Sequence, residues 1–243
     1  MLISYARIKN MKIALYALPD ITIGKQNIKD VRLDQVDKLV KAKKKTSVQV
    51  ELVGENEIPN ADAILTFSDS RTDLIIKDLE FVEGRLGRSA SDDEKALLQK
   101  LKAVLEKEEF IFSSPLTPQE KELMSGYGLV TGKPVVCVEK QELEDISSVL
   151  AKAYKESGYI SFFTVGDKEN RAWSLKQGAT AWEAAGVIHS DIQKGFIRAE
   201  IIGFNDFIQA GGETQAKQAG KQRLEQKDYI MQDADLANFR FNK

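Results

Sequence analysis

The sequence predicts an α/β protein of two parts, an α/β layer followed by a smaller, strand-rich domain. Before Gly158, short apolar runs alternate with segments of helical periodicity, which is typical of strands layered with helices. After Gly158, runs of strand length dominate, with a short helix among them. We therefore expect one domain over residues 1–157 and a second over residues 158–243.

Four strands and several helices are expected in the first part. Apolar or alternating segments predict strands over residues 13–18, 47–53, 61–67 and 134–138. Apolar residues at spacings of three or four predict helices over residues 30–43 and 143–154. Thr117 is a cap that places Pro118 at the first position of another helix.

Two amphipathic segments near residues 70–110 predict an antiparallel helical hairpin. Gly84 and Gly87 weaken the end of the first helix, and the stretch 89–92 offers an N-cap for the second. The apolar positions that repeat along the two helices are Leu74, Ile75, Leu79, Val82, Leu86, Leu97, Leu98, Leu101, Val104 and Leu105.

In the second part, strands are expected over residues 161–165, 171–176, 196–202 and 238–241. A short helix over residues 180–187 lies between the second and third of them.

Composition limits the classes of function. The chain has 243 residues and a net charge of −2, which argues against coating nucleic acid with its whole surface and leaves room for a local basic patch. The single cysteine, Cys137, excludes an internal disulfide and a cysteine-rich metal site, and it suits a reducing compartment. The apolar runs are too short to cross a bilayer, and no signal peptide is evident, so we expect a cytoplasmic protein.

The last third carries a dense set of short motifs. They are Phe-Phe-Thr-Val-Gly at 162–166, Arg-Ala-Trp at 171–173, Ala-Ala-Gly-Val-Ile-His at 184–189, Lys-Gly-Phe-Ile-Arg-Ala-Glu at 194–200, and Asp233 leading to Phe-Arg-Phe-Asn at 239–242. Together they resemble the C-terminal TGS domain of the YchF-type, Obg-related ribosome-binding ATPases. The resemblance implies a ubiquitin-like β-grasp fold and a binding module for RNA, ribosomal surfaces or the rest of its own chain.

The first part resembles the nucleotide domain of the same family in a reduced form. The matching stretches are 12–19, Val-Arg-Leu-Asp at 31–34, the shortened helical insertion 74–104, Gly-Leu at 128–129 and Lys-Pro-Val at 133–135. The resemblance therefore implies a P-loop-NTPase-like α/β layer with a helical hairpin insertion.

The phosphate-binding loop of such a domain is degenerate. The motif needs two glycines that let the backbone approach the phosphates, followed by a lysine and a magnesium-binding hydroxyl. Here Gly24 and Lys25 are followed by Gln26, and the spacing from Ala17 to Gly24 is two residues too long. We interpret Gly24 and Lys25 as an ordinary loop, with a vestigial phosphate grip as the alternative.

The remaining parts of the nucleotide site are also weak. Glu51-Leu52-Val53-Gly54 imitates the magnesium-binding Asp-x-x-Gly but lies within a predicted strand. Of the base-reading Asn-x-x-Glu, only the glutamate is present, as Glu142. We therefore expect very slow or no hydrolysis and no cofactor, with ATP or GTP and magnesium bound only if the site has been rebuilt.

A partner surface is the other candidate site. Lys217, Lys221 and Arg223, with Lys227 nearby, are predicted on one helix of the second part. Alongside exposed aromatic residues such as Trp173 or Trp182, they could meet RNA phosphates. His189, the only histidine, excludes a multi-histidine metal site and is interpreted as a structural cap or a surface contact. The lysines at 41 and 43–45 are interpreted as a solvated helix end.

These observations predict a non-catalytic binding protein whose partner is the ribosome, RNA or a regulatory protein. The first alternative is an atypical ATP- or GTP-binding protein that grips phosphate through Gly24 and Lys25. The second is a sensor that holds a small ligand in the C-terminal domain or in the vestigial cleft.

Overall fold

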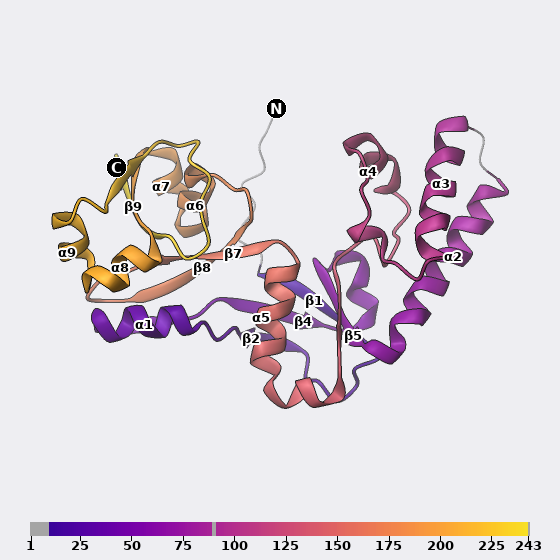
Figure 1. Ribbon diagram of the computed structural model, residues 1–243, viewed down its shortest axis with the longest axis horizontal. Coiled ribbons are helices and arrows are strands. Elements are labelled where there is room, and N and C mark those ends of the chain that lie inside the picture. Colours follow the sequence, from indigo (N-terminus) through magenta and orange to yellow (C-terminus); the bar gives the residue numbers. More distant parts are fainter. Residues whose placement is uncertain (1–9, 89–90, 243) are drawn as a thin grey trace. The chain divides into compact units, whose positions relative to one another are not determined.

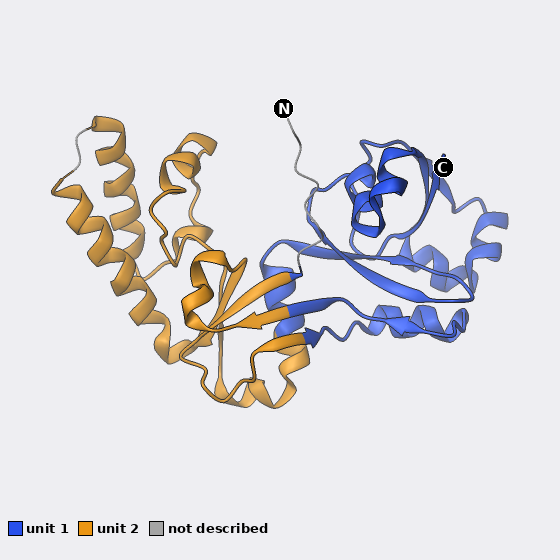
Figure 2. Cartoon of the chain, turned by 180° about the vertical axis from the view of Figure 1, so that it is seen from behind, with its two compact units in different colours: residues 1–10, 26–50, 150–243 blue, residues 11–25, 51–149 orange. Residues whose placement is uncertain are grey.

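The computed structural model describes residues 10–88 and 91–242. The expected α/β class is confirmed: the chain forms a five-stranded and a six-stranded sheet, with helices around them (Figure 1). Its contacts divide the chain into two compact units (Figure 2). Unit 2 contains Met11–Lys25 and Glu51–Val149, whereas unit 1 contains Gln26–Val50 together with Leu150–Lys243. The domain boundary at 157/158 stays a prediction. In the structure, residues 26–50 group with the C-terminal part of the chain.

The five-stranded sheet has the order β2-β4-β1-β5-β6. Its strands are β1 (Met11–Tyr16), β2 (Gly24–Asn27), β4 (Gln49–Val53), β5 (Ala63–Phe67) and β6 (Val135–Val138). The pairs β1–β5 and β5–β6 are parallel, with Ile13 opposite Ala63 and Ile64 opposite Val135. Parallel strands covered on both faces need near-continuous apolar sequence, which explains why the apolar runs of the central strands β1 and β5 were recognisable.

A helical hairpin extends from this sheet, as expected. It consists of α2 (Arg71–Leu86) and α3 (Asp92–Leu105), and α4 (Pro118–Met124) follows with a capping box formed by Thr117 and Glu120. The Ser91 side chain caps α3 by accepting a hydrogen bond from the Glu94 amide, while residues 89 and 90 lie outside the described residues. The apolar stripes of α2 and α3 meet in one core that includes Val82, Leu98 and Leu101.

One buried carboxylate joins the hairpin to the approach to β6. Asp78 on α2 is 3% exposed and accepts hydrogen bonds from the amides of Val130 and Thr131 at 2.9 and 2.7 Å, and from the Thr131 hydroxyl at 2.7 Å. Burial raises the pKa of Asp78, although these three donors oppose the shift. The carboxylate thus holds the chain between α4 and β6 against α2.

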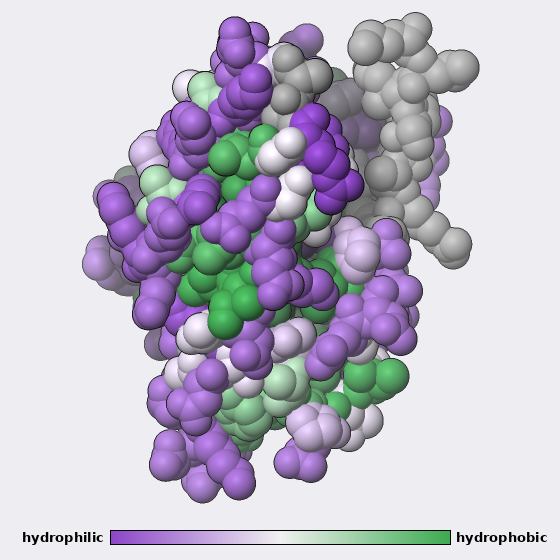
Figure 3. Space-filling model, turned by 90° about the vertical axis from the view of Figure 1, so that its right-hand side faces the viewer, coloured by the Kyte–Doolittle hydropathy of each residue, from purple (hydrophilic) through white to green (hydrophobic). Residues whose placement is uncertain are grey.

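Short 3-10 helices complete the connections of unit 2: η1 (Glu55–Asn60), η2 (Ser68–Ser70), η3 (Ile111–Ser113) and η4 (Lys140–Asp145). Figure 3 looks onto the side that carries the hairpin, where hydrophobic residues gather amid hydrophilic surface. Exposed apolar side chains of unit 2 include Ile76, Phe81, Phe112 and Leu123. No helix within the described ranges is long and apolar enough to cross a membrane.

The six-stranded sheet has the order β10-β9-β11-β7-β8-β3. Its strands are β3 (Lys45–Thr46), β7 (Tyr159–Thr164), β8 (Asn170–Lys176), β9 (Phe196–Ile202), β10 (Arg223–Glu225) and β11 (Leu236–Phe241). The helices of unit 1 are α1 (Val31–Leu39), α6 (Ala181–Ile188), α7 (Ser190–Lys194), α8 (Phe204–Ala210) and α9 (Glu213–Gln218), and α5 (Ile146–Glu156) continues into it from unit 2.

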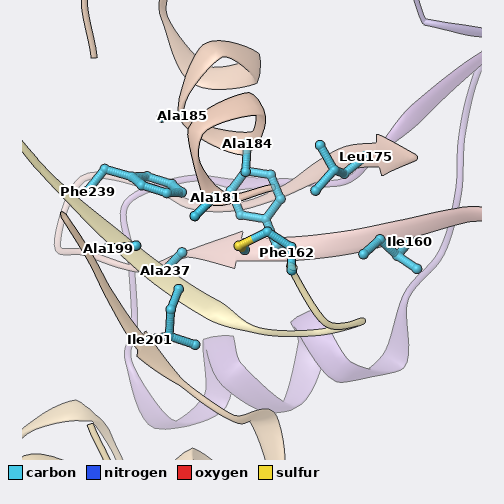
Figure 4. Packing of buried hydrophobic residues seen from close by; sticks show 11 residues of the cluster. Ile160, Phe162, Leu175, Ala181, Ala184, Ala185, Ala199, Ile201, Ala237 and Phe239 are labelled. Atoms are coloured by element: carbon cyan, nitrogen blue, oxygen red, sulfur yellow. The ribbon is translucent and has the colours of Figure 1, made fainter. Parts of the chain in front are cut away.

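Helix α6 packs on one face of this sheet, as the expected β-grasp fold requires (Figure 4). Its buried side is made of the small residues Ala181, Ala184 and Ala185, which let the helix lie close to Phe162. Phe162 meets Phe239 edge-on at 6.1 Å between ring centroids. Thr180 and Glu183 start the helix with a capping box, so the expected helix at 180–187 is confirmed.

Helix α1 ends at Leu39 and not at residue 43, which corrects the sequence-based expectation. Asn170, which is fully buried, donates to the Val40 carbonyl at 2.6 Å and to the Asp37 carboxylate at 2.7 Å. Val40 is extended, and the following residues form β3 alongside β8. A long-range hydrogen bond therefore ends this helix, and the local sequence does not signal it.

Candidate functional site

The carboxyl end of β1 is the place where a parallel α/β sheet of this kind would hold a phosphate. Here the chain turns through Ala17, a non-glycine residue with a φ of 54°. The Ala17 amide donates a hydrogen bond to Glu55 Oε1 at 3.0 Å. A carboxylate of the protein thus accepts the hydrogen bond that the Ala17 amide would otherwise donate to a phosphate oxygen.

Gly24 and Lys25 do not form a loop, which corrects the expectation for them. They begin β2, at the edge of the five-stranded sheet, and the Lys25 side chain is exposed. A phosphate-binding lysine stands at the start of a helix, but the next helix, α1, begins only at Val31. Its N-terminus is capped by the carboxylate of Asp30, which accepts the Arg32 amide at 2.9 Å.

Glu142 lies in η4 and is turned toward its own backbone. Its Oε2 accepts a hydrogen bond from the Glu139 amide at 2.8 Å, which forms a capping box. A cavity of about 240 Å³ lies at the ends of β5 and β6, and Glu142 is not among its lining residues. The cavity is lined by Phe67, Ser68, Asp69, Val138, Glu139, Lys140 and Gln141.

The charges around the end of β1 are unfavourable to a triphosphate. Burial raises the pKa of the Tyr16 hydroxyl, and Asp73 and Glu55 raise it further. No group of three or more His, Cys, Asp and Glu side chains that could hold a metal ion occurs within the described residues. The residues present therefore do not fit a magnesium–triphosphate held by a phosphate loop, and no hydrolytic step follows from them.

Trp173 and His189 have structural contacts in unit 1. Trp173 stacks on Phe162 at 6.4 Å, and its indole N–H donates to the Thr164 hydroxyl at 2.9 Å. The Arg171 guanidinium lies 3.9 Å from the centre of the Trp173 ring. His189 is the N-cap of α7, and its Nδ1 accepts the Asp191 amide at 3.1 Å.

The expected helix carries Lys217 but neither Lys221 nor Arg223, which corrects the prediction for these two residues. Helix α9 ends at Gln218 because Gly220, with a φ of 69°, turns the chain, and the Lys221 amide bonds back to the Ala216 carbonyl. Lys221 thus lies beyond the helix and Arg223 begins β10.

Each of these three cations already has a partner. Lys217 pairs with Glu213 at 2.5 Å and Lys221 with Asp206 at 3.1 Å. Arg223 donates to the Tyr229 hydroxyl at 3.0 Å. They are therefore poorer candidates for a phosphate contact than the sequence indicated.

Sequence reasoning missed a second polar site. The Val-Arg-Leu-Asp motif and Asp233 were each noted, but nothing in the sequence indicated that they meet. Arg32 Nη1 donates to Asp233 Oδ2 at 2.7 Å, and the same guanidinium is held by Asp30 at 2.8 Å. Both carboxylates raise the pKa of Arg32 against the opposing effect of burial. A cavity of about 740 Å³ beside this contact is lined by Arg32, Gly203, Phe204, Asn205, Asp206, Gln209, Arg223, Gln232, Asp233, Ala234 and Asp235.

Comparison with known proteins decides the family. The profile for the C-terminal domain of YchF GTPases (YchF-GTPase_C), described as "Protein of unknown function (DUF933)", matches residues 159–242. The Ribosome-binding ATPase YchF of Haemophilus ducreyi is 36% identical over an alignment 248 positions long, and the match covers 76% of this chain and 68% of that protein. The chain belongs to the YchF family.

Other YchF proteins extend the likeness. The Ribosome-binding ATPase YchF of Haemophilus influenzae is 55% identical over 97 residues, which cover 40% of this chain and 27% of that protein. The solved structure of the Schizosaccharomyces pombe YchF GTPase matches with a TM-score of 0.75 at 20% identity, covering 97% of this chain and 99% of that one. At this identity the match to the S. pombe protein shows a shared fold.

The family corrects one expectation. We expected no cofactor, and this is wrong, because the YchF relatives are named as ATPases and a GTPase, which act on a nucleotide. The chain nevertheless spans only 68% of the H. ducreyi protein, so activity does not transfer from that protein by similarity alone.

Proposed function

We propose that this YchF-family protein is a ribosome-associated binding protein that hydrolyses nucleotide very slowly or not at all. Ribosome association is supported by the names of its relatives, and the retained C-terminal domain, residues 159–242, is the part we assign to it. The loss of hydrolysis is supported by one observation above all: Glu55 accepts the Ala17 amide at the end of β1. A carboxylate at this point opposes the negative charge that phosphoryl transfer develops.

Two assays test this proposal together. The purified protein is expected to co-sediment with ribosomes, and its rate of ATP or GTP hydrolysis is expected to match a protein-free control. Absence from the ribosome pellet at low and moderate salt would refute the association. A magnesium-dependent turnover that Glu55→Gln alters would refute the loss of catalysis.

Nucleotide binding is a second candidate function, favoured by the ATPase and GTPase names of the relatives. A ligand that binds the folded state raises the melting temperature, so magnesium-ATP and magnesium-GTP are compared at millimolar concentration. If the increase in melting temperature is lost in Lys25→Ala, the nucleotide-binding contact is assigned to β2. A shift that grows in Glu55→Gln instead assigns it to the Ala17 turn, because removing the carboxylate's charge makes room for an anion.

A further inference from the structure

Two segments far apart in the sequence form one edge of the six-stranded sheet. The terminal strand β3 pairs in parallel with β8, with Lys45 opposite Asn170 and Thr46 opposite Arg171. The Lys43 amide donates to the Asp167 carbonyl at 3.1 Å, and the Asn170 amide donates to the Lys44 carbonyl at 2.9 Å. The turn before β3 therefore lies beside the turn that joins β7 to β8.

This edge is strongly basic, although the whole chain has a net charge of −2. Residues 38–46 and 165–171 contain seven lysines and arginines but only two carboxylates, Asp167 and Glu169. Glu169 pairs with Lys44 at 3.3 Å and lies 4.0 Å from Arg171, so its charge is paired with cations of the edge itself. On the adjoining helix, Asp34 pairs with Lys45 at 2.6 Å, and Asp37 accepts from Asn170.

Three cations of the edge remain free to meet a partner. Lys41, Lys43 and Lys168 are exposed, and within the described residues none of the three makes an ion pair. Their backbone is fixed by β3 and by buried Asn170, so the charges are presented from an ordered surface. Lysines on an ordered backbone lose less conformational entropy on binding than lysines on a disordered segment would.

The edge also carries a planar cation on an aromatic ring. Arg171 lies 3.9 Å from the centre of the Trp173 ring, while that ring is held by Phe162 and by Thr164. A guanidinium stacked in this way keeps its other face available to a nucleobase, and its N–H groups that do not face Glu169 can meet a phosphate. This combination favours RNA over an acidic protein, which offers no base to stack.

We infer that this edge, which we call the lysine edge (Lys41, Lys43, Lys44, Lys168 and Arg171), binds the phosphate backbone of RNA. The inference rests on the proposed ribosome association and names the surface and the chemistry that carry it. Lysines contact successive phosphates, and Arg171 stacks on or bonds to an exposed base. Because such contacts release counterions, binding weakens steeply as the salt concentration rises.

The test uses the full chain and a labelled 20-nucleotide single-stranded RNA, with anisotropy measured over a series of salt concentrations. The variant Lys41→Gln/Lys43→Gln/Lys168→Gln is compared with Lys95→Gln/Lys107→Gln/Lys121→Gln, which removes three exposed lysines from unit 2. The first variant is expected to lose at least tenfold in affinity, and its salt slope should drop by about 2, at roughly 0.7 per lost phosphate contact. The control should bind like the wild type.

Arg171→Lys separates stacking from charge. It keeps the charge, so the salt slope should be unchanged, while affinity for RNA falls several-fold because the planar guanidinium is gone. The inference is overturned if both triple variants bind RNA equally, or if the wild-type protein binds no RNA, whether or not it binds vesicles of anionic lipid. Ribosome co-sedimentation of the same proteins keeps the two proposals apart. Sedimentation that both triple variants retain in full would refute the lysine edge and leave the ribosome proposal standing, whereas a wild-type protein that never sediments refutes the latter.

Discussion

Arg32 and Asp233, which are 201 residues apart, form a two-bonded ion pair in unit 1, with N–O distances of 2.7 and 3.3 Å. Asp233 also accepts the Ser161 amide at 3.1 Å, and the Arg32 guanidinium lies 5.9 Å from the Phe163 ring. The pair therefore joins the start of α1 to both β7 and the loop before β11. It makes residues 26–50 an integral part of the C-terminal unit.

A double-mutant cycle with Arg32→Ala and Asp233→Ala measures this link. Both side chains are about a third or more exposed, so we expect a coupling energy of about 0.5–1 kcal/mol and not the larger value of a buried pair. Both tryptophans lie in unit 1, so tryptophan fluorescence during urea unfolding reports on this unit. A coupling energy of zero would mean that the pair does not hold α1.

Replacing Asn170 is expected to loosen α1 and β3 more than any change of a surface residue there. Asn170→Ala leaves the partly buried Val40 carbonyl and Asp37 carboxylate without their donor, at a cost of about 1–2 kcal/mol. Hydrogen exchange of the amides in residues 31–46 should speed up, while α2 and α3 stay protected. Asn56→Ala, at an exposed position of η1, serves as the control. Equal exchange in the two variants would contradict the role assigned to Asn170.

We expect Asp78 to make unit 2 more stable in mild acid than at neutral pH. Burial raises its native pKa above the unfolded value of about 3.9, so the native state holds the proton longer. Stability therefore falls as pH rises from the unfolded to the native pKa, and then levels off. Asp78→Asn should remove this slope. It should also lower the free energy of unfolding by about 2 kcal/mol, because the new NH2 group cannot accept a hydrogen bond from the backbone amide of Val130 or Thr131 that it faces. The measurement is hydrogen exchange of α2 and α3 between pH 4 and 7, with exposed Asp93→Asn as the control. The assignment fails if the slope survives in Asp78→Asn.

We expect Glu200 to give the stability of unit 1 the opposite dependence on pH. It is 7% exposed, and hydrogen bonds from Arg240 at 2.8 and 3.1 Å lower its pKa. The contribution of Glu200 to the stability of unit 1 is complete above its unfolded pKa of about 4.3. That contribution is lost as the pH falls toward its lower pKa in the native state. Because Arg240 is half exposed, Glu200→Gln should cost only about 1 kcal/mol at pH 7. Urea unfolding followed by tryptophan fluorescence at pH 3 to 7 measures this effect. The free energy of unfolding of Glu200→Gln should fall less steeply toward acid pH than that of the wild type. Glu122→Gln should keep the wild-type slope; a matching loss in both variants would rule out Glu200 as its source.

Much of the fold follows from local sequence. The strand β1 was predicted because an apolar run acts over a few residues. The start of α6 is local as well, since Thr180 and Glu183 form a capping box. The end of α1 and the strand β3 were not predicted, because Asn170 and β8 determine them from more than 120 residues away. The helix expected beyond Gln218 failed at Gly220, whose helix-ending role was overlooked.

The candidate sites show the same limit. The missing phosphate loop was visible in the spacing from Ala17 to Gly24, but the contact between Ala17 and Glu55 was not. The lysines at 41 and 43–45 were interpreted as a solvated helix end, because nothing local places Lys168 and Arg171 beside them. Charge clusters assembled by a sheet require the sheet to be known first.

The place of β11 determines when the six-stranded sheet can close during synthesis. This strand, Leu236–Phe241, lies between β9 and β7, although it leaves the ribosome after every other strand of that sheet. Until then β7–β8 and β9–β10 are separate hairpin-like pieces, and the apolar side chains of α1, translated far earlier, have no finished surface to cover. Such distant pairings close slowly. A nascent chain of this protein therefore carries Leu33 and Val36 without their completed packing surface through most of its translation.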